Sequence, residues 1–326
     1  MTDAPLCLVA DVGGTNTRVA LARAGRIVPD TVRRYGNSGF AGLDAVLAQF
    51  RADEDCPVPG GACIAVAGPV RGGVGRLTNL DWAMDGPGLA AATGARHVAV
   101  LNDLQAQGHA LGHLAPEALR SVIAAKAEPG GSQLVIGVGT GFNAAPVHEG
   151  PGGRVVVPSE CGHVTLPVRG DADLRLSRFV AQVHGFPGVE EVLSGRGIAH
   201  VDAWLAASAG ESGTRDSAAV LAALEAGEPR ARQTVATAVR MLGAVAGDLA
   251  LIHLPFGGLH LIGGMARALV PWLDEFGFAE AFRDKGRFAP LMADFPVWVI
   301  EDDFAALTGC ARHLAQRMGD VAPPEN

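Results

Sequence analysis

Residues 6–23 read LCLVADVGGTNTRVALAR, and this stretch decides the fold. Its apolar start, Leu6 to Ala10, is typical of a buried strand that ends at Asp11. The alternating residues 17–23 are typical of a second strand. Gly13-Gly14 therefore joins two strands in a hairpin. A dinucleotide-binding fingerprint needs a helix after its glycines, so the sequence argues against a dinucleotide-dependent oxidoreductase.

The second half of the chain opens in the same style. The apolar residues 134–136 enter Gly137-Val138-Gly139-Thr140-Gly141, and a β-like stretch resumes at Ala144. We interpret this as a weak internal duplication. Alternating strands and helices predict an α/β protein with a substantially parallel core. Strands are expected at 63–67, 97–101, 259–262 and 297–300, and helices at 41–52, from about 104, and at 172–184, 196–208, 216–226, 229–253 and 305–317.

Composition limits the function classes. The 326 residues include 26 Lys+Arg and 34 Asp+Glu, a net charge of −8, which argues against nucleic-acid partners and anionic membrane surfaces. No apolar run reaches the roughly 18 residues of a membrane span, and the start lacks a basic leader region. The five cysteines are widely spaced with no CxxC pair, which argues against disulfide frameworks and structural zinc sites. We therefore expect a cytoplasmic protein.

Three glycine turns are candidate phosphate-binding sites, because glycines let backbone N–H groups approach a ligand closely. The first is Asp11 to Asn16, where Asp11 is positioned to hold Mg²⁺. The second is Gly139-Thr140-Gly141, with the Thr140 hydroxyl as a donor. The third is Gly263-Gly264, after another apolar strand. Each turn taken alone also fits an ordinary hairpin or a plain strand-to-helix turn.

Asn102-Asp103 is the candidate for acid–base chemistry. The pair ends an apolar strand, and carboxylates there face the crevice in which open α/β sheets bind ligands. Asp103 is suited to accept the proton of a substrate hydroxyl as that hydroxyl attacks phosphorus. The alternative is that one of the two residues only caps the following helix.

Two further segments carry polar side chains suited to a sugar. Glu160 and His163 lie in a loop marked by Pro158 and Gly162, so metal binding by an ExxH helix is discounted, and a solvated loop is the alternative. Glu190 and its neighbour Glu191 fit ligand contacts or helix first-turn charges. Cys161 beside His163 is a poor nucleophile candidate because no third orienting group is evident. The remaining histidines show no ligand spacing.

Taken together, these segments resemble the bacterial glucokinase family of the actin/hexokinase superfamily, in its zinc-free branch. The matches run in family order over nearly the whole chain. They comprise residues 8–18 (LVADVGGTNTR), 67–70 (AGPV), 77–82 (LTNLDW), 101–104 (LNDL), 139–141 (GTG), 160–163 (ECGH), 190–195 (EEVLSG), 257–258 and 262–264 (GG and IGG), and 278–288 (FAEAFRDKGRF).

The resemblance implies a two-domain actin-like ATPase (ribonuclease H-like) fold with a sugar-binding cleft between the domains. A small α/β domain would comprise residues 1–110 plus about 303–326, and a large α/β domain residues 111–302. It also implies ATP-dependent phosphorylation of D-glucose to glucose 6-phosphate, with Mg²⁺. We expect a homodimer by default.

The resemblance also implies roles for individual residues. Asp103 matches the general base that acts on the 6-hydroxyl of glucose. The sugar-binding positions are Asn79, Asn102, Asp103, Glu160, His163 and Glu190. The nucleotide-binding positions are Ala10, Asp11, Val12, Gly13, Gly14 and Thr15, then Thr140 and Gly141, then Gly263 and Gly264; Asp11 lies near the metal. These roles depend on segments around residues 11–15, 102–103 and 139–141 converging on one crevice.

The chain departs from the family pattern at two places. Phe142-Asn143 stands where the family has an apolar residue and a glycine, so the Asn143 side chain would crowd a phosphate or donate a hydrogen bond to it. Cys161 replaces the first glycine of Glu-Gly-Gly-His. Two alternatives therefore stay open: a kinase for another hexose, such as mannose or a 2-amino or 2-acetamido sugar, and a sugar-binding regulator with little transfer activity.

Overall fold

The computed structural model describes residues 4–77 and 80–319. The chain divides into two compact units, which we treat one at a time. The first unit comprises residues 1–115, 150–156 and 302–326, and the second comprises residues 116–149 and 157–301. Both ends of the chain and a short internal segment therefore belong to the first unit.

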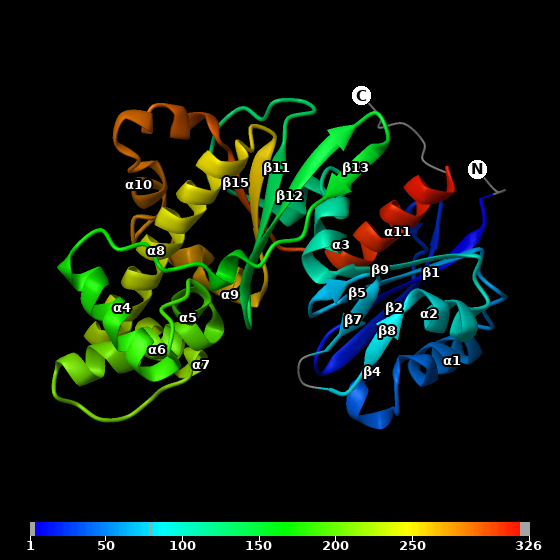
Figure 1. The fold of residues 1–326 in the computed structure, drawn as a ribbon, viewed down its shortest axis with the longest axis horizontal. Helices are drawn as coiled ribbons and strands as arrows, with labels where there is room; N and C mark the ends of the chain where they lie inside the picture. Colours follow the sequence, from blue (N-terminus) through cyan, green and yellow to red (C-terminus); the bar gives the residue numbers. More distant parts are fainter. Residues whose placement is uncertain (1–3, 78–79, 320–326) are drawn as a thin grey trace. The chain divides into compact units, whose positions relative to one another are not determined.

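A mixed sheet forms the centre of the first unit (Figure 1). Its hydrogen-bonded order is β3-β2-β1-β5-β9, and β4 also pairs with β2. The hairpin predicted from Gly13-Gly14 is confirmed, since β1 and β2 are antiparallel, whereas β1, β5 and β9 are mutually parallel. The strands are β1 (Leu6–Val12), β2 (Asn16–Arg23), β3 (Arg26–Ile27), β4 (Arg33–Gly36), β5 (Gly61–Val66) and β9 (His97–Asn102).

Helices cover both faces of this sheet because alternate residues of β1 point to opposite sides. Leu8, Ala10 and Val12 pack with the helices α1 and α2, while Cys7 and Val9 pack with α3 and α11. These helices are α1 (Leu43–Asp53), α2 (Gly86–Thr93), α3 (Asp103–Ala110) and α11 (Ala305–Met318). The sequence did not predict β4, the small antiparallel sheet of β6 (Val70–Arg71), β7 (Val74–Arg76) and β8 (Ala83–Asp85), or β13 (Gly153–Val156).

α3 and α11 approach each other closely at a glycine. A Cβ atom built on Gly309 would lie 1.6 Å from the carbonyl oxygen of Ala106 on α3. No side chain fits in that space, so this crossing requires glycine. The contact places α11 directly against the helix that begins with Asp103.

Two histidines meet across the same helix pair. Nδ1 of His313 on α11 lies 3.0 Å from Nε2 of His109 on α3, and His109 is only 5% exposed. Burial, together with the nearby charges of His313 and Arg154, lowers the pKa of His109 to about 3. Burial likewise lowers the pKa of His313 to about 4. Both rings are therefore neutral at neutral pH.

Acidification is expected to destabilise the first unit through this pair. Below pH 6.5 the two histidines bind protons in the unfolded chain but stay neutral in the folded chain. The free energy of unfolding therefore falls from pH 6.5 towards about pH 4. Each histidine lowers the free energy of unfolding by up to ~1.4 kcal/mol per pH unit in that window. Urea unfolding of the wild type and of His109→Phe at pH 7 and pH 5 measures the effect. An equal loss of stability in both proteins would contradict it.

The second unit repeats the strand arrangement of the first. β11 and β12 form an antiparallel hairpin around Gly139–Gly141, and β11, β14 and β15 are parallel neighbours. β10, which the sequence did not predict, is antiparallel to β15. The predicted duplication is therefore visible as one strand pattern used twice. The strands are β10 (Leu119–Ile123), β11 (Gln133–Val138), β12 (Phe142–Gly150), β14 (Gly258–Ile262) and β15 (Val297–Ile300).

The helices of the second unit are α4 (Asp171–His184), α5 (Glu190–Leu193), α6 (Gly195–Ser208), α7 (Ser217–Glu225), α8 (Pro229–His253), α9 (Gly264–Leu269) and α10 (Phe278–Arg283). Short 3₁₀ turns occur at Asn37–Gly39, Pro116–Ala118, Cys161–His163, Val270–Trp272, Gly286–Phe288 and Leu291–Asp294.

Among the described residues, only α8 is long and apolar enough to cross a membrane. Its most apolar 18-residue window is 67% buried, and α8 packs in the core of this unit.

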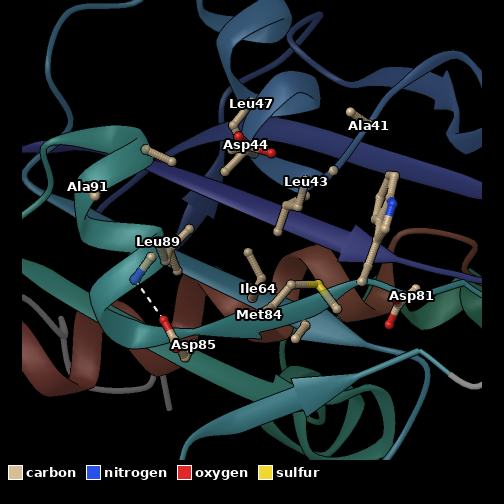
Figure 2. Close-up of a pocket in the computed structure, with 15 residues that line it drawn as sticks. Ala41, Leu43, Asp44, Leu47, Ile64, Asp81, Met84, Asp85, Leu89 and Ala91 are labelled. Atoms are coloured by element: carbon tan, nitrogen blue, oxygen red, sulfur yellow. Dashed lines mark hydrogen bonds between the residues drawn. The ribbon is translucent and has the colours of Figure 1, made fainter.

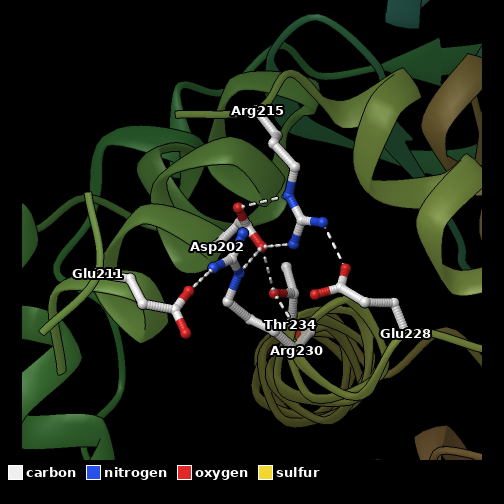
Figure 3. Close-up of polar contacts among 6 residues, drawn as sticks. All are labelled: Asp202, Glu211, Arg215, Glu228, Arg230 and Thr234. Atoms are coloured by element: carbon white, nitrogen blue, oxygen red, sulfur yellow. Dashed lines mark hydrogen bonds and ion pairs between the residues drawn. The ribbon is translucent and has the colours of Figure 1, made fainter. Parts of the chain in front are cut away.

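A buried ion cluster joins the N-terminal part of α8 to α6 (Figure 3). Asp202 on α6 is fully buried and accepts hydrogen bonds from Arg215, Arg230 and Thr234. Burial alone would raise the pKa of Asp202, but the hydrogen bonds and charges of the two arginines lower it overall. Glu228 pairs with Arg215 and Glu211 with Arg230. The cluster is therefore charge-paired at neutral pH.

Candidate functional site

In the first unit, the chemistry-bearing residues gather at one edge of the sheet. Val12 on β1 and Asn102 on β9 both align with Val66 on the intervening strand β5. Two strand spacings of 4.8 Å separate β1 from β9 by about 10 Å. The structure therefore brings the 11–15 turn and the Asn102-Asp103 pair to the same edge, as the sequence predicts.

Asn102, and not Asp103, caps helix α3. The Asn102 side chain accepts a hydrogen bond from the backbone N–H of Gln105 at 2.7 Å, and the Gln105 side chain accepts one from the Asn102 N–H at 3.2 Å. This reciprocal capping box satisfies the helix start. The Asp103 carboxylate accepts a hydrogen bond from the adjacent Leu104 N–H. Asn102 therefore fills the capping role. Asp103 lies in the first turn of α3, directly after strand β9.

The surroundings of the Asp11 carboxylate are suited to a metal ligand. Burial raises its pKa, and the charge and hydrogen bond of Arg18, whose Nη1 lies 3.3 Å from Oδ2, oppose that rise. Mg²⁺ is commonly held by one or two carboxylates together with substrate phosphates and water. A single, partly accessible carboxylate beside a glycine turn fits that donor set.

A buried asparagine, which the sequence analysis did not single out, fixes the first glycine turn. Asn37 is 2% exposed; its Nδ2 donates to the Gly13 carbonyl at 2.8 Å, and its backbone N–H donates to the Thr15 carbonyl at 2.9 Å. The Thr17 hydroxyl donates to Oδ1 of Asn37 at 2.8 Å. Asn37 therefore positions the turn. Nothing in the local sequence indicated this role.

In the second unit, the other two glycine turns lie against each other. Gly263 has φ of +108°, and a Cβ there would lie 2.5 Å from the Val138 carbonyl oxygen, at the start of the 139–141 turn. Gly139 accepts a hydrogen bond from the Gly195 N–H at 2.8 Å. The backbones of the two turns therefore approach each other closely, and such glycine turns are suited to phosphate binding by N–H groups.

Glu190 adjoins the second turn and the 160–163 loop. Its Oε2 accepts a hydrogen bond from the Phe142 N–H at 2.9 Å, and its Oε1 pairs with Arg196 at 2.8 Å. A Cβ on Gly141 would lie 2.6 Å from Oε2 of Glu190, and one on Gly162 would lie 3.4 Å from the Glu190 Cβ. The structure thus groups Glu190 with the Thr140-Gly141 turn and with the loop that carries Glu160 and His163.

The two departures from the family pattern contact each other. Asn143 Oδ1 accepts a hydrogen bond from the Cys161 N–H at 3.1 Å, and Asn143 Nδ2 donates to the Ser159 carbonyl at 2.5 Å and to Glu160 Oε2 at 3.1 Å. The Asn143 side chain therefore holds the 159–161 loop. Burial raises the pKa of the Cys161 thiol, which disfavours a nucleophilic thiolate.

Replacing Asn143 by Asp is expected to disturb the loop through charge. The new carboxylate would face Glu160 at the present 3.1 Å contact and would lose the donor to Ser159. Like charges at this distance repel. We expect the KM for the sugar that the family resemblance implies to rise by about tenfold, or 1.4 kcal/mol, with a smaller change in kcat. Steady-state kinetics at saturating ATP tests this, with Asn143→Gly, the family residue, as the control that adds no charge; an unchanged KM in the Asp variant would contradict it.

A hollow of about 600 Å³ lies elsewhere in the first unit, between α1, α2 and β8 (Figure 2). Leu43, Ile64, Trp82 and Met84 contribute apolar walls, and Asp44, Asp81 and Asp85 are the acidic lining residues. Neither Asp11 nor Asp103 lines it. The predicted sugar contact Asn79 lies outside the described residues.

The strand order and the backbone-built glycine turns, with a carboxylate at a strand end, define a phosphoryl-transfer protein of the actin-like ATPase fold. Residues 8–317 match the family model described as Glucokinase. The glucokinase of Mesorhizobium japonicum is 33% identical over 308 residues, covering 94% of this chain and 90% of that protein. The chain belongs to the glucokinase family.

Solved structures agree with this assignment. A glucokinase from an Antarctic psychrotroph matches with a TM-score of 0.86 at 31% identity, over 95% of this chain and 98% of that one. The glucose complex of the Balamuthia mandrillaris glucokinase matches with a TM-score of 0.78 at 20% identity, over 96% and 94% of the two chains. The second match bears on the fold alone.

Proposed function

We propose that this protein is a glucokinase that transfers the γ-phosphoryl group of ATP to the 6-hydroxyl of D-glucose, giving glucose 6-phosphate and ADP. The observation that supports the mechanism lies at the start of α3. Asn102 caps this helix, so Asp103, at the end of the strand, is not the capping residue. Family membership over residues 8–317 supports the activity.

In this mechanism Asp103 accepts the proton of the 6-hydroxyl as its oxygen attacks the γ-phosphorus. Asn102, Glu160, His163 and Glu190, with Asn79, bind and orient the sugar hydroxyls. Backbone N–H groups from Ala10–Thr15, with Thr140 and Gly141, bind phosphate oxygens, and Gly263-Gly264 contacts the adenosine side. Mg²⁺, held near Asp11, would neutralise phosphate charge.

We further propose that the two units are the small and large domains of such a kinase, and that the kinase is a cytoplasmic homodimer with no nucleic-acid or membrane partner. The −8 net charge supports the absence of a nucleic-acid or anionic-membrane partner.

The deciding experiment is a sugar panel at fixed ATP and Mg²⁺, with ADP release coupled to an optical readout. Glucose is expected to give the highest kcat/KM, above mannose, glucosamine and N-acetylglucosamine. A higher value for another hexose would reassign the substrate. Glucose binding by calorimetry without any turnover would instead favour a regulator.

A further inference from the structure

Two histidines and a glutamate from three successive helices meet beside the proposed sugar site. His184 is the last residue of α4, Glu191 lies in α5 and His200 lies in α6. One ligand atom from each lies within 4.8 Å of the others. The two imidazole rings are 4.0 Å apart between centroids, and Nδ1 of His184 is 3.8 Å from Oε2 of Glu191. Linear sequence gives no such cluster, because the histidines lack ligand spacing.

We propose that His184, Glu191 and His200 form a binding site for a divalent transition-metal cation, with Zn²⁺ as its occupant. Two imidazoles and one carboxylate are a recognised three-residue zinc donor set, with water as the fourth ligand. Imidazole ligands select transition metals over Mg²⁺, which prefers oxygen. Zn–N and Zn–O bonds of about 2.1 Å place tetrahedral ligand atoms about 3.4 Å apart. Side-chain movements of about 1 Å therefore close this set around an ion.

The surroundings of His200 suit a ligand. Its Nδ1 lies 2.9 Å from the Glu191 carbonyl oxygen and 3.4 Å from Oε2 of Glu191, the carboxylate oxygen of the cluster. Metal-bound histidines typically orient themselves by such a bond to a carbonyl. The His184 side chain is 28% exposed, which gives an ion access from solvent.

Arg196 is the competing cation at this cluster. Its Nη2 lies 3.8 Å from Oε1 of Glu191 but only 2.8 Å from Oε1 of Glu190. Arg196 therefore stays paired with Glu190 when a metal binds Oε2, the other carboxylate oxygen of Glu191. An ion would thus join α4, α5 and α6 and restrain the short helix that carries Glu190.

Metal binding is tested first without sugar or nucleotide, so that its result is independent of the proposed kinase activity. Tag-free protein stripped by a chelating resin is titrated with Zn²⁺ against a chromophoric chelator, and with Co²⁺ for its visible absorption. We expect one Zn²⁺ per chain and tetrahedral Co²⁺ bands. His184→Ala and Glu191→Gln should each weaken Zn²⁺ binding beyond the ~10–100-fold that loss of an outer contact costs.

The matched control is His97→Ala, which removes an exposed histidine of the first unit and should bind Zn²⁺ like the wild type. Circular dichroism verifies that each variant is folded. Zn²⁺ should raise the Tm of the wild type and not that of Glu191→Gln. Absence of stoichiometric binding, or equal affinity in the wild type and in both cluster variants, would overturn the proposal.

A second measurement tests the link to α5 and rests on the proposed function. The KM for glucose of the wild type is expected to shift by a few-fold between stripped and Zn²⁺-loaded protein, and to stay constant in Glu191→Gln. An unchanged wild-type KM would overturn the coupling to Glu190.

Discussion

Asp103→Asn is expected to lower kcat by ~10²–10⁴, the range for removal of a general base. The amide keeps nearly the size of the carboxylate but does not accept a proton at neutral pH. The KM for glucose should change little, because the remaining proposed sugar contacts are unaltered. Coupled ADP release at saturating glucose and ATP measures the loss.

Stability should be nearly unchanged in the same variant, because the capping box belongs to Asn102 and Gln105. Asp44→Asn is the matched control, since Asp44 also supplies a first-turn acid, on α1. Both variants lose a helix-dipole interaction of about 0.3–1 kcal/mol, but only Asp103→Asn should lose turnover. A kcat for Asp103→Asn within twofold of the wild type would remove Asp103 from the mechanism.

Asp202→Ala is expected to cost ~3–5 kcal/mol of unfolding free energy, because removing one partner leaves buried charges unpaired. Arg215 and Arg230 both point at this fully buried carboxylate, as Figure 3 shows. Glu228 and Glu211 compensate the arginines only at their outer ends. The loss should therefore fall on the packing of α6 against α8.

Guanidinium unfolding followed by tryptophan fluorescence suits this test, because Trp204, Trp272 and Trp298 all belong to the second unit. Asp171→Ala removes an exposed first-turn acid of α4 and should cost less than about 1 kcal/mol. Asp202→Asn should fall between the two, since it retains the shape without the charge. Equal midpoints for Asp202→Ala and Asp171→Ala would show that the cluster does not stabilise the unit.

Local sequence signals predicted the bounds of several helices well. Helix α8 spans residues 229–253 as expected, since Pro229 suits a helix start and Leu254, at φ of +47°, ends it. Helices α4, α6, α7 and α11 lie within one residue of their predicted bounds. The first two glycine turns were predicted as hairpins because a strand resumes after each of them, and both hairpins are confirmed.

Contacts between distant residues could not be predicted in this way. Asn37 reaches Gly13 across 24 residues, and nothing in its local sequence indicates the partner. Asn143 was expected to affect a phosphate, yet its side chain holds the loop 16 residues further on. His184 and His200 belong to different helices and meet only through their packing. The roles of the site residues remain predictions that the variants above test.

The late position of α11 in the chain has a consequence for synthesis on the ribosome. Ala306, Leu307, Cys310 and Leu314 cover one face of the β1-β5-β9 sheet, whose strands are translated roughly two hundred to three hundred residues earlier. Until α11 is synthesised, this apolar face of the amino-terminal sheet therefore lacks the cover of α11 while the second unit emerges from the ribosome. A translation product that stops before residue 305 would expose that face to chaperones and proteases and would leave α3 without its packing partner.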